Sequence, residues 1–248
     1  MAIYDFFYDV SITEKSGFGV WYEYMVKYRI FRLFKDSKKV LVFGLPERYS
    51  LGLDTLSFAT NSELHIVDTN MDFLKNYKKF ADMFNKKVKI IHVDDLKKTE
   101  FLKKNKYDLL VSAEVLQNDT TLFKIMKEFS EDIVIFVPNK QCYAHPRISH
   151  ENSLSINELK KLGGENKLIL IKSGYLDCPP WPAGAMLPRQ KGKESDESIF
   201  LKFAKKVLVK VTPFLTIFDS YHISPWKELN SHIVFGIFKN MNLTNIKK

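Results

Sequence analysis

The chain has 248 residues, of which 45% are hydrophobic and 27% are charged. This length and composition predict a globular protein with one well-buried domain, or one such domain with an added cap. The apolar runs are too short to span a bilayer, and the first ten residues lack the basic start and apolar stretch of a signal peptide. We therefore expect a soluble, cytoplasmic protein with no membrane partner.

The formal net charge of +9 at pH 7 permits an anionic partner such as a nucleic acid. The lysines, however, are spread along predicted helices and alternate with apolar positions, which is typical of solvated helix faces. The two cysteines, Cys142 and Cys178, are too isolated in the sequence to form a disulfide framework or a metal site. We expect no metal and interpret both cysteines as structural thiols.

An N-terminal section, residues 1–37, precedes the first predicted strand. Within it, residues 17–34 predict a helix with aromatic residues at intervals of three to four and basic residues elsewhere on its surface. The aromatic positions are Trp21, Tyr24, Tyr28 and Phe31. This pattern predicts an amphipathic helical cap packed on the domain. It also fits a lid whose aromatic face covers a ligand cleft, and the two roles are compatible.

The chain next contains a strand, a sharp turn, a helix and a second strand, which is the pattern of a βαβ unit. The first strand is predicted over residues 40–43, the turn begins at Gly44, and the helix extends through Ala59. The second strand, residues 64–67, stops at Asp68. Because open α/β sheets bind ligands at the carboxyl ends of their strands, Gly44 and Asp68 mark a candidate site.

The chemistry of this turn discriminates among nucleotide ligands. A pyrophosphate site requires closely spaced glycines and backbone amides at a helix N-terminus. Here Gly44 is followed by Pro46, which has no amide donor, and by the acidic Glu47. Asp68 lies at roughly the spacing from Gly44 at which an acidic residue accepts hydrogen bonds from a ribose. A ligand with adenosine but no phosphates satisfies both observations, and S-adenosylmethionine is such a ligand.

Strands and helices continue to alternate beyond Asp68. Helices are predicted over residues 71–84, 96–104, 122–129 and 155–162. Strands are predicted over residues 88–92, 107–112, 133–137 and 167–172. The last of these helices opens with the capping-box pattern Ser155-x-x-Glu158. Alternation at this spacing implies an α/β fold with a doubly wound, mostly parallel sheet.

The last third of the chain does not continue this alternation of strands and helices. Residues 174–196 are rich in proline and glycine and predict a long loop, which in a compact domain is usually functional or mobile. An amphipathic helix is predicted over residues 197–211. Residues 232–239 predict a final strand at the edge of the sheet.

The order of these features resembles the class I S-adenosylmethionine-dependent methyltransferases, particularly the small-molecule type. The resemblance rests on the single-glycine turn, the strands followed by Asp68 and Asp94, and the segment YDLLVSAEVLQ, which is similar to the family's fourth strand. It covers residues 38–176, and residues 232–239 match the family's antiparallel seventh strand. The resemblance implies a Rossmann-like, seven-stranded domain over residues 38–248 with S-adenosyl-L-methionine as its cofactor.

The same resemblance implies roles for individual residues. Asp68 matches the residue that binds the ribose hydroxyls, and Asp94 matches the acidic residue near the adenine amino group. Pro46 and Arg48 replace two glycines of the family's turn, which leaves open that Arg48 reaches the methionine carboxylate instead. The complete predicted cofactor site is Gly44, Leu45, Arg48, Asp68, Thr69, Asp94, Asp95, Ala113 and Glu114.

Structural roles remain open for several of these acidic residues. Asp94 or Asp95 fits a helix N-cap, and Glu114 fits a solvated helix start as well as it fits a cofactor contact. Asp108 begins a predicted strand away from the ligand edge, so we expect it to serve the fold.

The loop after the fifth predicted strand carries the candidate catalytic residues Tyr143, His145 and His150. A histidine there could take a proton from an attacking oxygen or nitrogen, and a structural hydrogen bond is the alternative. Methyl transfer from a sulfonium needs mainly in-line alignment of donor and acceptor, so a base is not a requirement of the reaction.

The resemblance implies methyl transfer to a small-molecule acceptor, and two other functions stay open. The first is a nucleic-acid (RNA) methyltransferase, favoured by the charge and by Trp181. That residue ends a segment similar to the D-P-P-W motif of enzymes that methylate bases, interrupted here by Cys178. The second is a non-catalytic scaffold whose turn, altered at Pro46 and Arg48, no longer binds the cofactor.

Overall fold

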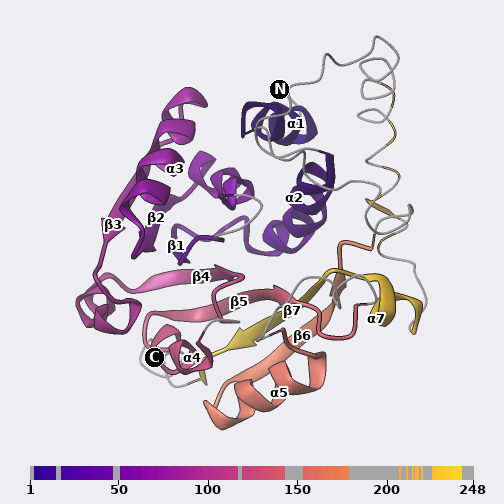
Figure 1. Cartoon of the computed structure of the whole chain (residues 1–248). Helices are drawn as coiled ribbons and strands as arrows, with labels where there is room; N and C mark the ends of the chain where they lie inside the picture. Colours follow the sequence, from indigo (N-terminus) through magenta and orange to yellow (C-terminus); the bar gives the residue numbers. More distant parts are fainter. Residues whose placement is uncertain are drawn as a thin grey trace.

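A seven-stranded sheet with helices on both faces forms the centre of the protein (Figure 1). The structure is a computed structural model. It describes residues 3–14, 18–46, 51–116, 119–142, 153–178 and 225–241, with the single residues 207, 211, 214, 216, 217 and 219. No helix in this part of the chain is long and apolar enough to cross a membrane.

The strand order is β3-β2-β1-β4-β5-β7-β6. The strands are β1 Lys39–Phe43, β2 Glu63–Asp68, β3 Val88–His92, β4 Tyr107–Ala113, β5 Ser130–Pro138, β6 Ile169–Leu176 and β7 Ile233–Lys239. The first five strands pair in parallel, whereas β7 runs antiparallel to both of its neighbours. The doubly wound, mostly parallel sheet predicted from the sequence is confirmed.

The last strand does not lie at the edge of the sheet, so the predicted edge position is wrong. β7 pairs with β5 on one side and with β6 on the other. The physical reason is its burial, since the residues from Ile233 to Phe238 are all buried, and such a strand requires neighbours on both sides and cover on both faces. β6 is the edge strand instead, and it continues to Leu176, so the predicted loop cannot begin at residue 174.

Most helices are shorter and more often 3-10 helical than the sequence pattern predicts, although α5 extends three residues beyond its predicted end at residue 162. The α-helices are α1 Ile3–Glu14, α2 Phe18–Phe31, α3 Met71–Met83, α4 Phe123–Met126, α5 Ile156–Glu165 and α7 Trp226–Asn230. The 3-10 helices are η1 Arg32–Phe34, η2 Leu53–Thr60, η3 Leu96–Lys98, η4 Glu100–Asn105 and η5 Thr120–Leu122. The helix predicted to end near Ala59 is therefore η2, and the one predicted over residues 96–104 is the pair η3 and η4.

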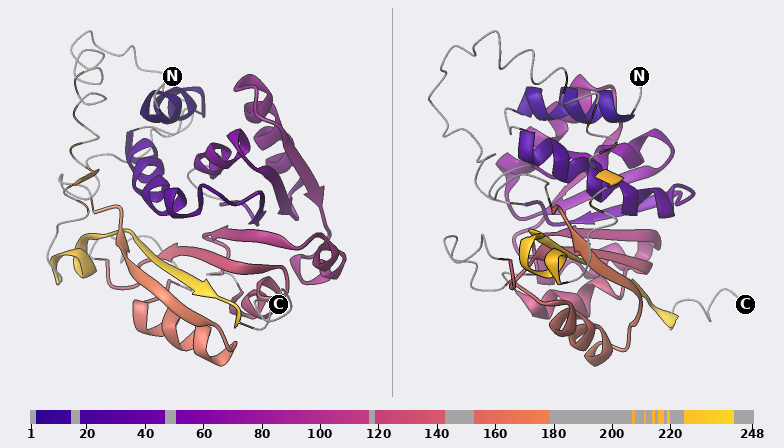
Figure 2. Two further views of the ribbon diagram at one scale, coloured as in Figure 1. Left: turned by 180° about the vertical axis from the view of Figure 1, so that it is seen from behind. Right: turned by 90° about the vertical axis from the view of Figure 1, so that its right-hand side faces the viewer.

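The helices divide between the two faces of the sheet (Figure 2). Val40 and Val42 of β1 point to one face, where α1, α2, η2 and α3 contribute to a single hydrophobic cluster. Leu41 and Phe43 point to the other face, which η4, α4 and α5 cover. This alternation follows from the two-residue period of a strand. Since α1 and α2 share a cluster with the sheet, they contribute to its core.

Two short-range predictions hold at the ends of elements. The capping box at the start of α5 is present, with Glu158 N donating to Ser155 Oγ at 3.2 Å and Ser155 N donating to Glu158 Oε2 at 2.8 Å. Asp108 serves the fold, because its Oδ2 accepts hydrogen bonds from the backbone amides of Lys38 and Lys39 at 2.8 and 3.0 Å. These bonds tie the start of β4 to the start of β1.

Neighbouring glycines in α5 give a test of this packing. A Cβ at Gly163 would lie 2.3 Å from Cε1 of Phe238, whereas a Cβ at Gly164 would meet no atom within 4 Å. We expect Gly163→Ala to lower the free energy of unfolding by about 1–3 kcal/mol, because the buried Phe238 ring must move. Gly164→Ala should leave stability unchanged or raise it by up to about 1 kcal/mol. Urea denaturation measures both, and equal effects of the two variants would contradict the packing described.

Candidate functional site

The carboxyl ends of β2, β1 and β4 meet at one edge of the sheet. β1 lies between β2 and β4 in the sheet. From β1 the chain adds β2 and β3 on one side, and it then returns to add β4 on the other side of β1. Such a reversal is the place where open α/β sheets bind ligands. Gly44 directly follows β1, Asp68 is the last residue of β2, and Glu114 directly follows β4. The structure thus brings these three sequence-predicted residues to one edge.

Gly44 is required by both its backbone conformation and its surroundings. Its φ is +77°, and a Cβ at this position would lie 2.5 Å from Cγ2 of Val115. The Gly44 amide donates to Val67 O at 2.8 Å, and the next amide, Leu45 N, donates to Asp68 Oδ2 at 2.7 Å. The side chain of Leu45 is buried in the core. The turn is therefore fixed against the end of β2.

Asp68 connects the turn to the following helix. Besides the bond from Leu45, its Oδ1 accepts a hydrogen bond from Asn70 N at 2.6 Å, and Asn70 in turn caps α3. An ionised carboxylate can accept about four hydrogen bonds. Both carboxylate oxygens of Asp68 thus accept backbone hydrogen bonds, one from the turn and one from the residue that caps α3.

Thr69, Asp94 and Asp95 lie further along the same edge, beyond the ends of β2 and β3. Asp94 and Thr69 are exposed, and Thr69 O lies 3.1 Å from Nε2 of His92. Asp95 caps η3, since its Oδ1 accepts a hydrogen bond from Lys97 N at 2.8 Å. The N-cap interpretation of Asp95 is confirmed, and Asp94 has the greater freedom to meet a ligand.

A buried lysine belongs to α2, among the basic residues that the sequence analysis placed away from the aromatic positions of that helix. Lys27 in α2 is only 1% exposed and pairs with Glu23 one turn earlier. Asp54 of η2 and Glu114 also act on it electrostatically, and its ammonium lies 5.5 Å from the centre of the Phe136 ring. Burial alone lowers the pKa of Lys27, but the three carboxylates outweigh it and raise that pKa above its usual range. We call Glu23, Lys27, Asp54 and Glu114 the Lys27 cluster.

The conformation of Glu114 is unusual for a residue with a side chain. Its φ is +58°, which costs free energy for a non-glycine residue, and its amide donates to Phe136 O at 2.9 Å. Ala113, the last residue of β4, is buried. The end of β4 is thus held by a backbone hydrogen bond to β5.

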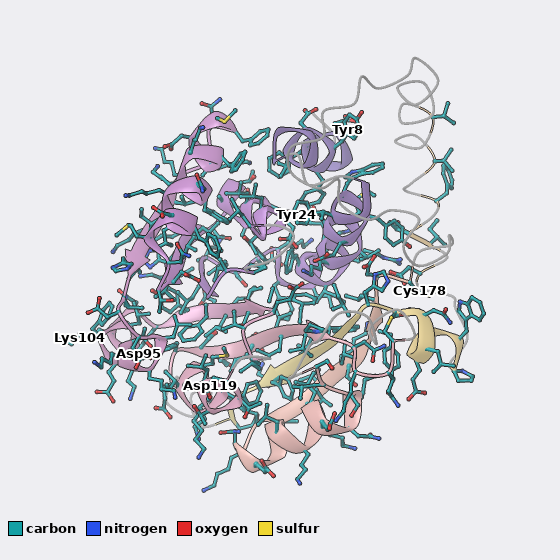
Figure 3. All side chains as sticks on the ribbon, viewed as in Figure 1. Tyr8, Tyr24, Asp95, Lys104, Asp119 and Cys178 are labelled. Atoms are coloured by element: carbon teal, nitrogen blue, oxygen red, sulfur yellow. The ribbon has the colours of Figure 1, made fainter. Side chains whose placement is uncertain are left out.

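A second group of ionisable residues lies where β6 ends and β7 begins. Nδ1 of His232 is 2.7 Å from Oδ2 of Asp177. Asp219 accepts hydrogen bonds from the backbone amides of Asp177 and Cys178 at 3.1 and 3.3 Å, and Lys227 Nζ lies 3.8 Å from its Oδ1. We call Asp177, Cys178, Asp219, Lys227 and His232 the His232 cluster. Figure 3 shows Cys178 near α7, far from Asp95, which follows the opposite edge strand.

The surroundings raise the pKa of three groups in the His232 cluster, namely Asp219, Cys178 and His232. Burial raises the pKa of Asp219 to about 6, against the opposing effect of Lys227. Burial also raises the pKa of the Cys178 thiol to about 11, so this cysteine is a protonated, structural thiol at neutral pH. For His232 burial lowers the pKa, but Asp177, Glu23 and Asp219 together raise it above its ordinary value.

Several sequence-predicted residues have other positions or roles. Arg48, Tyr143, His145, His150 and Trp181 lie outside the described residues. Asn139, which follows β5, is fully buried and donates from its side chain to the carbonyl oxygens of Glu228 and Ser231 at 2.7 and 2.8 Å. Among the described residues there is no group of three or more His, Cys, Asp or Glu side chains that could hold a metal ion.

Comparison with known proteins identifies the fold. No protein-family model and no curated protein matches the sequence. Two structures of the methyltransferase domain of the bacterial protein CtHen1 match 88% of this chain at 12% identity, covering 98% and 96% of the domain with TM-scores of 0.50 and 0.53. Coclaurine N-methyltransferase bound to N-methylheliamine and SAH matches 88% of this chain and 72% of its own, at 11% identity and a TM-score of 0.51.

These likenesses, together with the strand order and the antiparallel β7, establish the class of the fold. The chain has the class I, Rossmann-like methyltransferase fold. At identities of 11% and 12% the likeness concerns the fold alone.

The raised pKa of Asp219 predicts a pH dependence of stability. A carboxyl group with a folded pKa of about 6 and an unfolded pKa of 3.8 contributes most to stability below pH 3.8 and loses that contribution as the pH rises through about 6. Asp219→Asn removes this titration. The free energy of unfolding of the variant, relative to the wild type, should therefore rise by about 2–3 kcal/mol between pH 4 and pH 7.

Chemical denaturation at several pH values measures this difference. Asp82→Asn is the control, because Asp82 is an exposed carboxylate on α3 paired with Lys78. A difference for Asp219→Asn that stays constant over the same pH range would contradict the raised pKa.

Proposed function

We propose that the protein is an S-adenosylmethionine-dependent methyltransferase that acts on a small-molecule acceptor. The observation that supports this most directly is the hydrogen bond from Leu45 N to Asp68 Oδ2, at 2.7 Å. It sets a single-glycine turn directly against a carboxylate at the point where this fold binds its ligand. A carboxylate at that place favours ribose hydroxyls and disfavours a pyrophosphate.

The residues around the turn fit the parts of this cofactor. Asp68 would accept hydrogen bonds from the ribose hydroxyls, and Gly44 would allow the chain to approach closely. Thr69, Asp94 and Asp95, beyond β2 and β3, would contact the adenine end. Ala113 and Glu114 would line the methionine end, with the Glu114 carboxylate within electrostatic range of Lys27. Arg48 would reach the methionine carboxylate, as the family resemblance implies.

The bound cofactor would supply a methyl group already activated on a sulfonium. The contribution of the chain is then to align the acceptor and to exclude water. The aromatic side chains of α2, including Trp21 and Tyr24, are fully buried in the core, so they support the helix that carries Lys27 and do not themselves meet the acceptor. Tyr143, His145 and His150 remain proposed acceptor contacts in the loop that follows β5.

Lys27 is only 1% exposed and is therefore unsuited to contact a phosphate. Lys97, in the helix η3 that Asp95 caps, is 50% exposed and is the kind of basic side chain that nucleic-acid binding requires. The charge thus leaves a nucleic-acid acceptor as the alternative. The coclaurine N-methyltransferase structure, which has the same fold, holds a small molecule, N-methylheliamine.

Calorimetric titration with S-adenosylmethionine tests the proposal. We expect the wild-type protein to bind it and Asp68→Asn to bind it at least about tenfold more weakly, a loss of about 1.4 kcal/mol, because one acceptor oxygen becomes an amide donor. The matched control is Asp108→Asn. Asp108 also accepts two backbone hydrogen bonds, but it lies at the start of β4. This control should lose stability and keep its affinity.

Circular dichroism establishes that both variants are folded before binding is compared. Wild-type affinity in a folded Asp68→Asn variant would contradict the assignment of Asp68. If the wild-type protein bound neither S-adenosylmethionine nor S-adenosylhomocysteine, the function of a non-catalytic scaffold would replace the one proposed.

A further inference from the structure

We propose that a hollow at the C-terminal end of α3 binds a small anion that carries a phosphate group. The hollow has a volume of about 460 Å³ and is lined by Lys78, Asp82, Asn85, Lys86, Lys87 and Val88. This inference goes beyond the proposed methyltransferase function and does not depend on it.

The hollow lies at the edge of the sheet opposite to the candidate cofactor site. α3 begins at Met71, shortly after β2 ends at Asp68, and the C-terminal part of the helix lines the hollow. Val88, also in the lining, is the first residue of β3 and so lies at the amino end of that strand. Since α3 has 13 residues and rises about 1.5 Å per residue, its two ends are about 20 Å apart. A ligand in the hollow is therefore distinct from the cofactor and from the methyl acceptor.

The chain turns at the hollow through a compact helix end. Asn85 has a φ of +53°, a left-handed conformation that asparagine adopts more readily than most residues. Its amide donates to Asp82 O at 3.0 Å, and the amide of Lys86 donates to Ala81 O at 2.7 Å. This pair of bonds is a Schellman motif, which satisfies carbonyl groups at the end of the helix. Lys86 and Lys87 are thus presented by a turn of defined geometry.

Lys86 is a partly buried ammonium group without a carboxylate partner among the described residues. Its Nζ donates to Thr60 Oγ1 of η2 and lies 5.5 Å from the centre of the Phe6 ring of α1. Burial lowers the pKa of Lys86, and no charge from the described residues offsets this effect. Because an ammonium group has three hydrogens to donate, one hydroxyl partner leaves two for a bound anion.

The other residues of the lining add to the positive charge of the hollow. Lys87 is exposed and forms no ion pair with the described residues. Lys78 Nζ lies 2.6 Å from Oδ1 of Asp82, so the acidic residue of the lining is already paired. Three lysines and one aspartate leave the lining with a net charge of +2. Since the C-terminal end of a helix opposes an anion, binding has to come from these lysines.

The size and polarity of the hollow define the class of ligand. Pockets for small molecules typically have volumes of about 300–1,000 Å³, so this hollow has room for more than a bare phosphate ion. Lysine binds phosphate as a point charge, and the side chain of Asn85 can donate and accept hydrogen bonds. The lining therefore favours a compact, polar phosphate monoester.

The test is a titration of the full chain with inorganic phosphate and with glycerol 3-phosphate, followed by amide NMR. We expect both probes to shift the amide signals of residues 85–88 and to leave those of Leu45 and Asp68 unchanged. The monoester should do so at the lower concentration. Glycerol, the neutral control, should shift none of these signals. Binding should weaken as sodium chloride is added, because salt screens the attraction.

Lysine variants separate the hollow from the general positive charge of the protein. Lys86→Met should weaken the binding of glycerol 3-phosphate at least about tenfold, because a charge-assisted hydrogen bond is lost. Lys87→Met, at an exposed position where the change does not threaten the fold, should weaken it about threefold. Lys124→Met is the matched control, since it removes the same charge from an exposed position on α4, on the other face of the sheet. This control should keep the wild-type affinity.

The outcomes identify the ligand as well as the site. Tighter binding of glycerol 3-phosphate supports a phosphate monoester, whereas equal affinities support free phosphate, and both uphold the site. If neither probe binds, or if the shifts are confined to Leu45 and Asp68, the inference is overturned. Wild-type affinity in the Lys87→Met variant and in a folded Lys86→Met variant overturns it as well.

Discussion

The burial of the Lys27 ammonium is the constraint on which this arrangement depends. Removing such a charge from water costs several kcal/mol unless opposite charges compensate it. Glu23 in α2, Asp54 in η2 and Glu114 after β4 provide that compensation. The position of α2 is therefore set by charge as well as by apolar contacts. Glu23 acts electrostatically on both Lys27 and His232. This one carboxylate therefore couples the charges near the end of β4 to those where β6 ends and β7 begins.

The sheet could be predicted from the sequence because its central strands β1, β2, β4, β5 and β7 contain short apolar runs that are mostly buried, and the outer strands β3 and β6 follow in the same alternation with helices. The helices were less predictable, because local hydrogen bonds stop them early. Asp95 caps η3, and Thr99 Oγ1 bonds back to Leu96 O at 2.8 Å, so the pattern over residues 96–104 gives two short 3-10 helices. Hydrophobic periodicity alone contains no information about such competing bonds.

Some residues of the candidate site could likewise be predicted from the sequence, and others could not. Gly44 and Asp68 could be found from the sequence, because a βαβ unit fixes their separation along the chain. Lys27 was counted only among the basic residues away from the aromatic positions of its helix, since nothing local shows that Asp54 and Glu114, from other parts of the chain, join Glu23 of the same helix around it. Asp177 follows the sixth strand and His232 precedes the seventh, which was a usable signal. The pair was missed because the pairing of β6 with β7 is a contact between distant segments.

Because β7 lies between β5 and β6, the sheet cannot be completed before this last described strand has been synthesised. Among the described strands β6 pairs only with β7, so when β6 and α5 leave the ribosome this partner has not yet been made. The parallel strands β1 to β5 can assemble earlier, since each finds its neighbour within the chain already synthesised. Until residues 233–239 emerge, β5 presents an open edge to other chains. The sheet is therefore completed late in synthesis, when β7 takes its place between β5 and β6.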